Sequence, residues 1–559
     1  MDTKWELKKQ HDVSSLVSTG LSPITLNLLK NRGLNTITEI EEFIHPDLNH
    51  LHDPFIMKGV KEAVKRIERA LKKQESIFIF GDFDVDGITS TSILVKLFRE
   101  KINYPVEYYL PDRHKEGYGL SKGAIDILSM MGANLIITVD CGISAVEEVG
   151  YANSLGIEII ISDHHEPQDV LPKGIVIDPK QKGCKYPNKN LAGCGVAFKL
   201  ACALYPDLIY EDDFDEYLNI VAFGSIADVV PLKDENRTIA YYGCRDMGNT
   251  TNLGLSTLIK KSDIKDSKIT AGQVGFNLAP KINAIGRVSK ADLGVELFLT
   301  KDLDEAERIV DELIFQNERR KEIESGMIDQ AIEIIENDES LKNGKIIFLA
   351  RDDWNTGVIG ITASKICEKY YKPVILLSIN KKGICKGSGR SIPSFSIFNP
   401  LMEAKPLLIG GGGHPVACGL SFDVEKLDEI KAIFEKHAKI LTDEDLKKVI
   451  KVDSTISEKD INVKLFDDIS LLEPFGIGNP TPVFELDNQY INSKRLLGKL
   501  QNHCKIISSS KFDILAFNST LDGVETKSII DIVGNISINE FRGEITPQLL
   551  LRDWRLTNG

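Results

Sequence analysis

Residues 77–87 read Ile-Phe-Ile-Phe-Gly-Asp-Phe-Asp-Val-Asp-Gly, an apolar run that ends in three aspartates at alternate positions. An apolar run of this length beside a glycine predicts a buried strand of a parallel sheet, and the periodic segment 88–98 predicts a helix. Asp82, Asp84 and Asp86 therefore follow the carboxyl end of a strand, which is where open α/β sheets bind their ligands.

Three carboxylates within five residues repel one another at neutral pH unless a cation neutralises them. Oxygen-rich clusters of this kind suit magnesium or manganese. A solvated acidic turn and a calcium loop of the D-x-D-x-D-G type are the alternatives. Calcium is disfavoured because Ile93 occupies the position at which that loop carries its glutamate.

Further acidic residues follow later apolar segments of the chain. The segments 135–139, 157–161 and 175–177 alternate with helical patterns, which predicts a parallel, doubly wound sheet. Residues that end its strands should share one crevice. The candidates at these ends, and after a helix-like segment at 217–226, are Asp140, Asp163, His164, His165 and Asp228.

Composition indicates an ordinary soluble protein. The 559 residues predict three or four domains, and no apolar run approaches the roughly 20 residues that span a bilayer. The opening residues 1–10 are polar, so we expect a cytoplasmic protein without a membrane association. Nine cysteines without a C-x-x-C pair predict neither a disulfide framework nor a thiolate zinc site. A net charge of −14 argues only weakly against a nucleic-acid partner, because phosphates respond to local patches and metals.

The remaining segments divide the chain into five predicted regions. Amphipathic patterns predict a helical lead-in over 1–72, before the α/β domain at 73–302 that contains the predicted parallel sheet. Helical spacing without proline predicts one long connecting helix over 303–340, which Gly326 could kink. A second α/β pattern covers 341–445, and short alternating strands over 446–559 predict a small barrel.

Cations and small residues mark a candidate anion site. The loop 111–119 contains Arg113 and Tyr118, which suggests a phosphate clamp with a stacking platform, although an ordinary polar loop fits equally well. The glycine-rich stretches 387–391 and 410–414 let backbone N–H groups approach a phosphate. A glycine run alone is usually a turn. Together with Arg390 and His414, which belong to these stretches, and with Arg113 and Arg287 from the earlier part of the chain, they predict an anion pocket.

Four ordered motifs, DFDVDG, TVDCG, SDHH and SIADVVPL, resemble those of the DHH phosphoesterase superfamily. Over nearly its whole length the chain is similar to the single-strand-specific 5′-to-3′ DNA exonucleases of that superfamily. The resemblance implies a two-lobed DHH core, in which a long helix joins the doubly wound sheet to a DHH-associated domain, followed by an OB-like barrel. The further matches are PDRHKEGYG, PKINAIGR at 280–287, NERR at 317–320, Trp354 with GVIG at 357–360, GSGRS at 387–391, GGGGH at 410–414 and EPFGIGNP at 473–480.

The resemblance also implies a centre with two divalent cations, Mn²⁺ or Mg²⁺. Asp82 and Asp84 would hold one cation, and Asp140 would bridge both. The other cation would bind Asp86, His164 and Asp228. Such a pair can activate water and stabilise both oxygens of an in-line displacement.

Roles for the neighbouring residues follow from the same resemblance. His165 would point at the scissile phosphate, and Asp163 would orient its neighbours. Tyr118 would stack on a base. The 5′-terminal phosphate, which sets the polarity of cleavage, would bind Arg113, Arg287, Ser388, Arg390 and His414.

Three functions are compatible with these residues. The first is a single-stranded-DNA exonuclease that releases 5′-mononucleotides in recombination and repair, as a monomer, with a helicase and a single-strand-binding protein as partners. The second is a nanoRNase or cyclic-dinucleotide phosphodiesterase, against which the long helix and the barrel count. The third is a non-catalytic replication scaffold, which the filled ligand positions disfavour.

Overall fold

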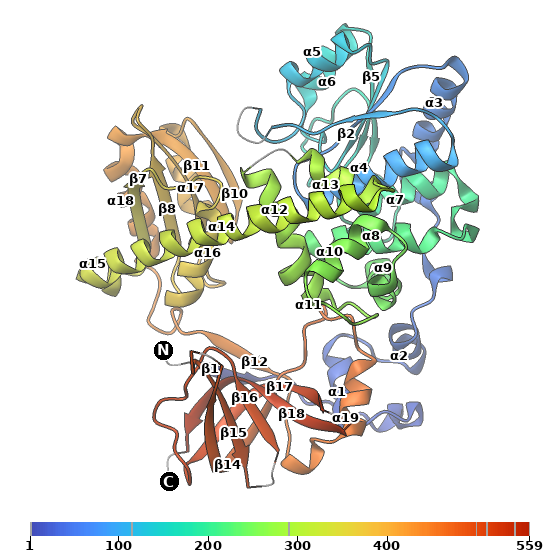
Figure 1. Ribbon diagram of the computed structural model, residues 1–559. Helices are drawn as coiled ribbons and strands as arrows, with labels where there is room; N and C mark the ends of the chain where they lie inside the picture. The colour runs from blue at the N-terminus through green and yellow to red at the C-terminus, as the bar shows by residue number, and fades with distance from the viewer. Residues whose placement is uncertain are drawn as a thin grey trace. The chain divides into compact units, whose positions relative to one another are not determined.

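The computed structural model describes residues 3–112, 116–288, 291–498, 500–509, 512–541 and 544–557 (Figure 1). The chain forms two compact units. The first comprises Met1–Trp5, Arg287–Ser289 and Ile314–Ile450, and the second Glu6–Gly286, Lys290–Leu313 and Lys451–Gly559. Within the described ranges, no helix combines the length and the apolarity that crossing a bilayer requires.

The sequence-predicted parallel sheet lies in the second unit. Its strand order is β3-β2-β4-β5-β6, and every neighbouring pair is parallel. The chain leaves β2 towards β3 on one side and returns as β4 on the other, so the sheet has a switch point between β2 and β4. The strands are β2 (Ile77–Phe80), β3 (Glu107–Tyr109), β4 (Leu135–Val139), β5 (Glu158–Ser162) and β6 (Ile175–Ile177).

Helices cover both faces of this sheet (Figure 1). Phe78, Phe80, Ile136 and Ile161 point to one face and share a hydrophobic cluster with α5 and α6. On the other face α4 contacts β2, β3 and β4, and α7 contacts β4 and β5. Strand residues are buried on both sides, which explains the continuous apolar runs. These helices are α3 (Val60–Lys73), α4 (Val85–Lys96), α5 (Lys122–Met130), α6 (Val146–Ser154) and α7 (Gly193–Leu204).

A helical layer continues the second unit beyond the sheet. Helix α4 runs into a π-helical turn at Leu97–Lys101, and a second π-helix, η7 (Val274–Leu278), leads directly into α12. The helices of this layer are α8 (Phe214–Ala227), α9 (Asp234–Arg245), α10 (Leu253–Lys261), α11 (Ala271–Gln273), α12 (Ala279–Val288) and α13 (Asp292–Leu299).

The carboxyl-terminal segment closes into a barrel. Its order is β14-β15-β16-β18-β17, and an antiparallel pairing of β17 with β14 completes the ring. β13 (Ser454–Thr455) adds to β14 in parallel. The predicted OB-like architecture is therefore confirmed. The barrel strands are β14 (Phe484–Leu497), β15 (His503–Ser508), β16 (Asp513–Ala516), β17 (Ile529–Phe541) and β18 (Glu544–Leu556), and α19 (Val463–Ser470) precedes them.

The lead-in differs from the purely helical prediction. It contains α1 (Pro23–Asn31) and α2 (Ile37–Ile44), but also a strand, β1 (Lys4–Leu7), which pairs with β12 (Val449–Val452). Leu26, Leu29 and Ile40 share one hydrophobic cluster with barrel residues such as Phe484. This partner lies more than 400 residues away in the sequence, so periodicity within the lead-in could not indicate it.

A buried arginine connects the segment that precedes the barrel to the helical layer of the same unit through hydrogen bonds. Arg237 on α9 is 4% exposed and donates to the carbonyls of Phe43 (2.9 Å), Leu472 (3.0 Å), Glu473 (2.9 Å) and Leu471 (3.3 Å). Its guanidinium also lies 3.7 Å from the centre of the Phe43 ring. One side chain thus joins the lead-in, the catalytic domain and the linker that enters the barrel.

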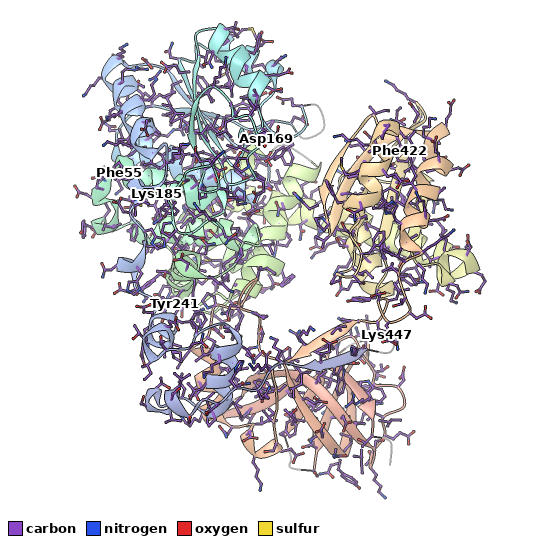
Figure 2. The ribbon with its side chains drawn as sticks, turned by 180° about the vertical axis from the view of Figure 1, so that it is seen from behind. Phe55, Asp169, Lys185, Tyr241, Phe422 and Lys447 are labelled. Atoms are coloured by element: carbon purple, nitrogen blue, oxygen red, sulfur yellow. The ribbon has the colours of Figure 1, made fainter. Side chains whose placement is uncertain are left out.

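The first unit contains the second α/β region. Its sheet has the order β10-β11-β9-β8-β7, in which only β7 and β8 are parallel. Side chains such as that of Phe422, fully buried and labelled in Figure 2, form its core with α16, α17 and α18. The elements are β7 (Ile347–Asp352), β8 (Val374–Ile379), β9 (Ile384–Arg390), β10 (Gly410–His414), β11 (Ala417–Asp423), α16 (Ile359–Tyr370), α17 (Phe398–Ala404) and α18 (Leu427–Ala438).

The long helix α14 (Leu303–Asn337) runs without interruption through Gly326, and the short α15 (Glu339–Asn343) follows it. The glycine run 410–414 is not a turn but an edge strand, because each glycine pairs with a residue of β11. Gly413 has no room for a side chain: a Cβ there would lie 2.5 Å from the Ala417 carbonyl oxygen.

Candidate metal centre

The strand ends bring the predicted acidic residues and imidazoles together. Their side-chain donor atoms form three groups, and within each group these atoms all lie within 4.8 Å of one another. Because β2, β4 and β5 are in parallel register, their carboxyl ends meet at the switch point of the sheet. The groups are Asp82–Asp84–Asp140, Asp86–His164–Asp228 and Asp140–His164–His165.

The first turn of α4 and the start of α7 fix two of the carboxylates. Asp84 is the N-cap of α4 and accepts hydrogen bonds from the backbone N–H groups of Asp86 (3.0 Å) and Gly87 (3.1 Å). Asp86 accepts from the N–H groups of Gly193 (2.6 Å) and Cys194 (2.8 Å) at the start of α7. No residue type in the sequence signals this second contact, because its donors are backbone N–H groups.

Gly193 leaves room for the bridging candidate. A Cβ at this position would lie 2.7 Å from the Cβ of Asp140, so only glycine lets α7 begin so close to the cluster. Asp140 itself has a φ of 60°, in the left-handed region that aspartate tolerates better than most residues. A glycine opening an apolar run was the only sequence signal for this contact, and it is a weak one.

His164 lies at the middle of the cluster. Its Nε2 is 3.1 Å from Asp140 Oδ1, 3.7 Å from Asp86 Oδ2 and 3.8 Å from Asp228 Oδ2. This buried nitrogen makes no hydrogen bond among the described residues, although three carboxylates surround it. An imidazole nitrogen aimed at three carboxylates without bonding to any is the arrangement that a shared cation would satisfy.

The electrostatics also fit divalent cations. Burial and the neighbouring carboxylates raise the pKa of Asp140 well above its usual value, and the same causes raise the pKa of Asp228 to about 8. Burial, with Asp86 beside it, also raises the pKa of Asp84. These groups cannot all be ionised at neutral pH by themselves. Cations would remove that penalty, and their binding would release protons.

Asp163 orients the residues that follow strand β5 through hydrogen bonds. Its Oδ1 accepts from the N–H groups of His164 (2.7 Å) and His165 (3.2 Å) and lies 2.8 Å from His165 Nδ1, while Oδ2 accepts from Ile143 N–H (2.9 Å). Burial opposes ionisation of Asp163, but the hydrogen bond and charge of His165 outweigh it and lower its pKa. Asp163 raises the pKa of His165 in turn, although burial opposes this.

We expect Asp163→Asn to weaken Mn²⁺ binding by about 10- to 100-fold, the usual cost of losing a group that orients metal ligands. An amide can accept through only one oxygen, so it cannot keep both sets of hydrogen bonds. Isothermal titration with Mn²⁺ measures the effect. Asp178→Asn is the matched control, because Asp178 is a fully buried strand-end aspartate outside the cluster. Equal Mn²⁺ affinity of the two variants would contradict the orienting role.

The predicted substrate residues lie in different parts of the chain. In the second unit, the hydroxyl of Tyr118 donates to the Asp140 carbonyl (3.2 Å), its ring packs edge-on against His165, and the residue is 55% exposed. Ser388, Arg390 and His414 lie in the first unit, on β9 and β10. Arg113 and the side chain of Arg287 lie outside the described part of the structure.

The sheet and its acidic edge define a DHH-type phosphoesterase domain. The family described as "DHH family, N-terminal domain" matches residues 76–225, which include all the cluster residues except Asp228. Two further families match, the DHHA1 domain at residues 343–440 and the RecJ OB domain at residues 452–553. All three matches fall inside the corresponding predicted regions, whose outer limits stay predictions.

Relatives of known name match almost the whole chain. It is 41% identical over 561 residues to the single-stranded-DNA-specific exonuclease RecJ of Bacillus subtilis, covering 98% of this chain and 70% of that protein. The RecJ of Escherichia coli is 32% identical, covering 97% of this chain and 98% of the relative. The crystal structure of RecJ from Thermus thermophilus with Mn²⁺ matches with a TM-score of 0.86 at 28% identity, covering 100% of this chain and 80% of that one. The chain belongs to the RecJ family.

Proposed function

We propose that this protein is a single-stranded-DNA-specific exonuclease that hydrolyses phosphodiester bonds with two divalent cations and proceeds from the 5′ end, releasing 5′-mononucleotides. The observation that carries the proposal is the buried cluster of carboxylates around His164 in a chain of the RecJ family. RecJ relatives have been crystallised with Mn²⁺ and with Mg²⁺, so the same two ions are proposed here.

The cluster offers a ligand set for each cation. Asp82, Asp84 and Asp140 would hold one, and Asp86, His164 and Asp228 the other, with Asp140 shared between them. Bound there, the cations would supply the charge that activates water and stabilises the attacking and leaving oxygens of an in-line displacement. The buried carboxylates are held in place by α4 and α7, so the ligand set is largely preformed.

His165 and Tyr118 are the candidates for contact with the substrate. Asp163 binds His165 at Nδ1 and favours the protonated ring, which can then donate to a phosphate oxygen through Nε2. The half-exposed ring of Tyr118 stands beside that imidazole and can support a base. These roles need no covalent nucleophile.

The first unit carries the proposed site for the terminal phosphate. Arg390 donates to Ser388 Oγ (2.7 Å) and Ser364 Oγ (3.1 Å), beside the N-terminal turn of α16. A Cβ at Gly360 would lie 3.1 Å from the guanidinium, so glycine gives it room. Arg390 also lines a cavity of about 310 Å³ with Lys448. A guanidinium, hydroxyls and a helix N-terminus together suit a phosphate. His414, Arg113 and Arg287 stay predicted members.

Arg390→Ala should remove the preference for a 5′-phosphate. We expect the ratio of initial rates on 5′-phosphorylated and 5′-hydroxyl strands to fall towards one, because the charge-assisted hydrogen bonds to the phosphate are lost. Lys386→Ala is the matched control, since Lys386 is an exposed cation on the same strand β9. A preserved ratio in Arg390→Ala would place the terminal phosphate elsewhere.

A substrate panel tests the proposed activity. With Mn²⁺, long single strands labelled at the 3′ end should shorten from the 5′ end. Blunt duplexes and internally labelled circular single strands should not be degraded. Cleavage confined to dinucleotides would favour the nanoRNase or cyclic-dinucleotide class, and no cleavage would favour a scaffold. The barrel and the RecJ match along the chain already argue against the smaller-substrate class.

Partners and location extend the same proposal. A role in recombination and repair implies cooperation with a helicase that exposes single strands and with a single-strand-binding protein, in the cytoplasm. We propose a monomer in solution, which sedimentation of the purified chain tests directly.

A further inference from the structure

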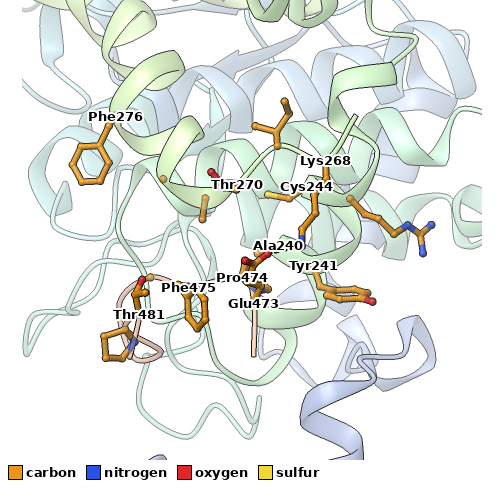
Figure 3. Close-up of a pocket in the computed structure, with 16 residues that line it drawn as sticks. Ala240, Tyr241, Cys244, Lys268, Thr270, Phe276, Glu473, Pro474, Phe475 and Thr481 are labelled. Carbon is orange, nitrogen blue, oxygen red and sulfur yellow. Dashed lines mark hydrogen bonds and ion pairs between the residues drawn. The ribbon is translucent and has the colours of Figure 1, made fainter. Parts of the chain in front are cut away.

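A second pocket lies in the same unit as the candidate metal centre. Its volume is about 410 Å³, within the range of ligand sites, and it is bounded by α9, by residues 268–276 and by the linker 473–481 (Figure 3). Tyr241, Phe276 and Phe475, labelled in Figure 3, line it from these three segments. None of the proposed site residues lines this pocket, although the segment 473–480 on one side of it is the EPFGIGNP motif of the family resemblance.

Phe276 is the unusual residue of the lining. It is 85% exposed, although a free phenylalanine ring costs hydration free energy, and it is carried by the π-helix η7. π-helical turns are rare and frequently occur at functional sites. Tyr241 and Phe475 also line the pocket but are partly buried, and Phe475 packs against the hydrophobic cluster of the lead-in and the barrel, so Phe276 offers the most exposed ring.

The charges that line the pocket suit a ligand with two parts. The part inside the pocket would be planar and uncharged, and the part outside it would be anionic. Lys268 pairs with Glu473, and Arg245 pairs with the neighbouring Asp246, so the lining carries little net charge in a chain of net charge −14. A pocket of this balance repels no anion, yet its mostly apolar interior would not bury a phosphate. A nucleobase on a phosphate backbone has both properties, whereas an aliphatic peptide segment would not need three aromatic rings.

Two contacts tie the pocket to the metal centre. The π-helix continues into α12, where Asn283 Oδ1 accepts a hydrogen bond from the N–H group of Val85, between Asp84 and Asp86. On the pocket floor, Ala240 and Ala271 share a hydrophobic cluster with Leu232 and Ile226, which flank Asp228. These contacts connect the pocket lining to the segments that carry Asp84, Asp86 and Asp228.

We propose that this pocket receives an unpaired base of the bound single strand, stacked on Phe276, at a nucleotide removed from the cleaved bond. The inference rests on the proposed function and adds a binding subsite to it. Strands long enough to reach the pocket gain affinity from it, and very short substrates do not. The subsite therefore acts on KM for long strands and leaves the chemical step alone.

The test compares Phe276→Ala with wild type on 5′-phosphorylated oligothymidylates of increasing length in Mn²⁺. For the longest strands KM should rise by about 5- to 150-fold, the fold-change that corresponds to losing one base–aromatic stack. We expect kcat for long strands and all parameters for dinucleotides to stay unchanged, and Phe276→Trp to restore KM. Phe55→Ala is the control, because Phe55 is 47% exposed and does not line the pocket.

Strand binding measured by fluorescence anisotropy in EDTA separates this inference from the proposed function. If wild type binds long strands but does not hydrolyse them, the function fails while the pocket can still be tested by binding. Unchanged affinity of both Phe276→Ala and Tyr241→Ala would overturn the pocket proposal and leave an apolar protein partner as its occupant. An equal loss on dinucleotides and long strands would also overturn it, since the residue would then act on the metal centre.

Discussion

Asp140→Asn is expected to abolish strand shortening while making the metal-free protein more stable than wild type. The carboxylate is 3% exposed, and burial together with Asp86, Asp84, Asp82 and Asp228 raises its pKa well above the usual value. A neutral amide removes this repulsion without changing the shape of the side chain. In EDTA above neutral pH, where the wild-type cluster must lose protons, the variant should melt a few degrees higher, about 2–4 °C for each kcal/mol relieved.

Added Mn²⁺ should reverse the order of stability. Wild type would gain the binding free energy of both cations, whereas Asp140→Asn would lose the ligand that we propose both cations share. The raised pKa of Asp140 also determines how the stability of the metal-free protein depends on pH. In the folded, metal-free state the group keeps its proton above the ordinary value, so its destabilising effect is absent at low pH and grows as pH rises above that value.

Activity should fall by at least on the order of 10²–10³-fold, the cost of removing one preorganised electrostatic group. Asp169→Asn is the matched control, because Asp169, labelled in Figure 2, is exposed and belongs to none of the three donor groups. A variant that melts below wild type in EDTA, or that keeps full activity with Mn²⁺, would remove Asp140 from the bridging position.

Arg237→Met is expected to produce the largest loss of stability. Burial lowers the pKa of Arg237 to about 9, so the fold keeps this cation only because four carbonyls accept its hydrogen bonds. Methionine fills a similar volume but donates nothing. Each buried carbonyl left without a donor costs about 1–3 kcal/mol, so a total on the order of 3 kcal/mol is expected after partial hydration.

Hydrogen exchange locates the effect. Protection should fall in the linker 471–480 and in the lead-in around Phe43, while the strands of the parallel sheet stay protected. Arg245→Met serves as the control, because Arg245 lies on the same helix but is exposed and forms its ion pair with the neighbouring Asp246. An Arg237→Met protein with wild-type protection in the linker would show that the guanidinium does not hold it.

The sequence was most informative where local pattern and chemistry coincide. The apolar strand before Asp82 and the parallel sheet were predictable because side chains buried on both faces leave continuous apolar runs. Once the sheet is parallel, the meeting of Asp82, Asp140 and His164 follows from topology. The roles of these residues stay predictions until the cations are bound.

Long-range contacts were beyond the reach of periodicity. Nothing near Asp86 indicates that its partners are the N–H groups of Gly193 and Cys194, because backbone donors carry no residue signature. Arg237 looked like an ordinary helix residue, since its acceptors are carbonyls from segments nearly 200 and over 230 residues away. The glycine run 410–414 reads locally as a turn, and only its pairing with β11 makes it a strand.

The packing of the lead-in against the barrel has a consequence for how the chain is made. Leu26, Leu28 and Leu29 emerge from the ribosome more than 400 residues before their apolar partners, such as Phe484 and Leu472. The two helices of the lead-in therefore cannot bury these side chains against the barrel until the barrel segment has been synthesised. During that interval their apolar faces stay exposed to the solvent or to a chaperone.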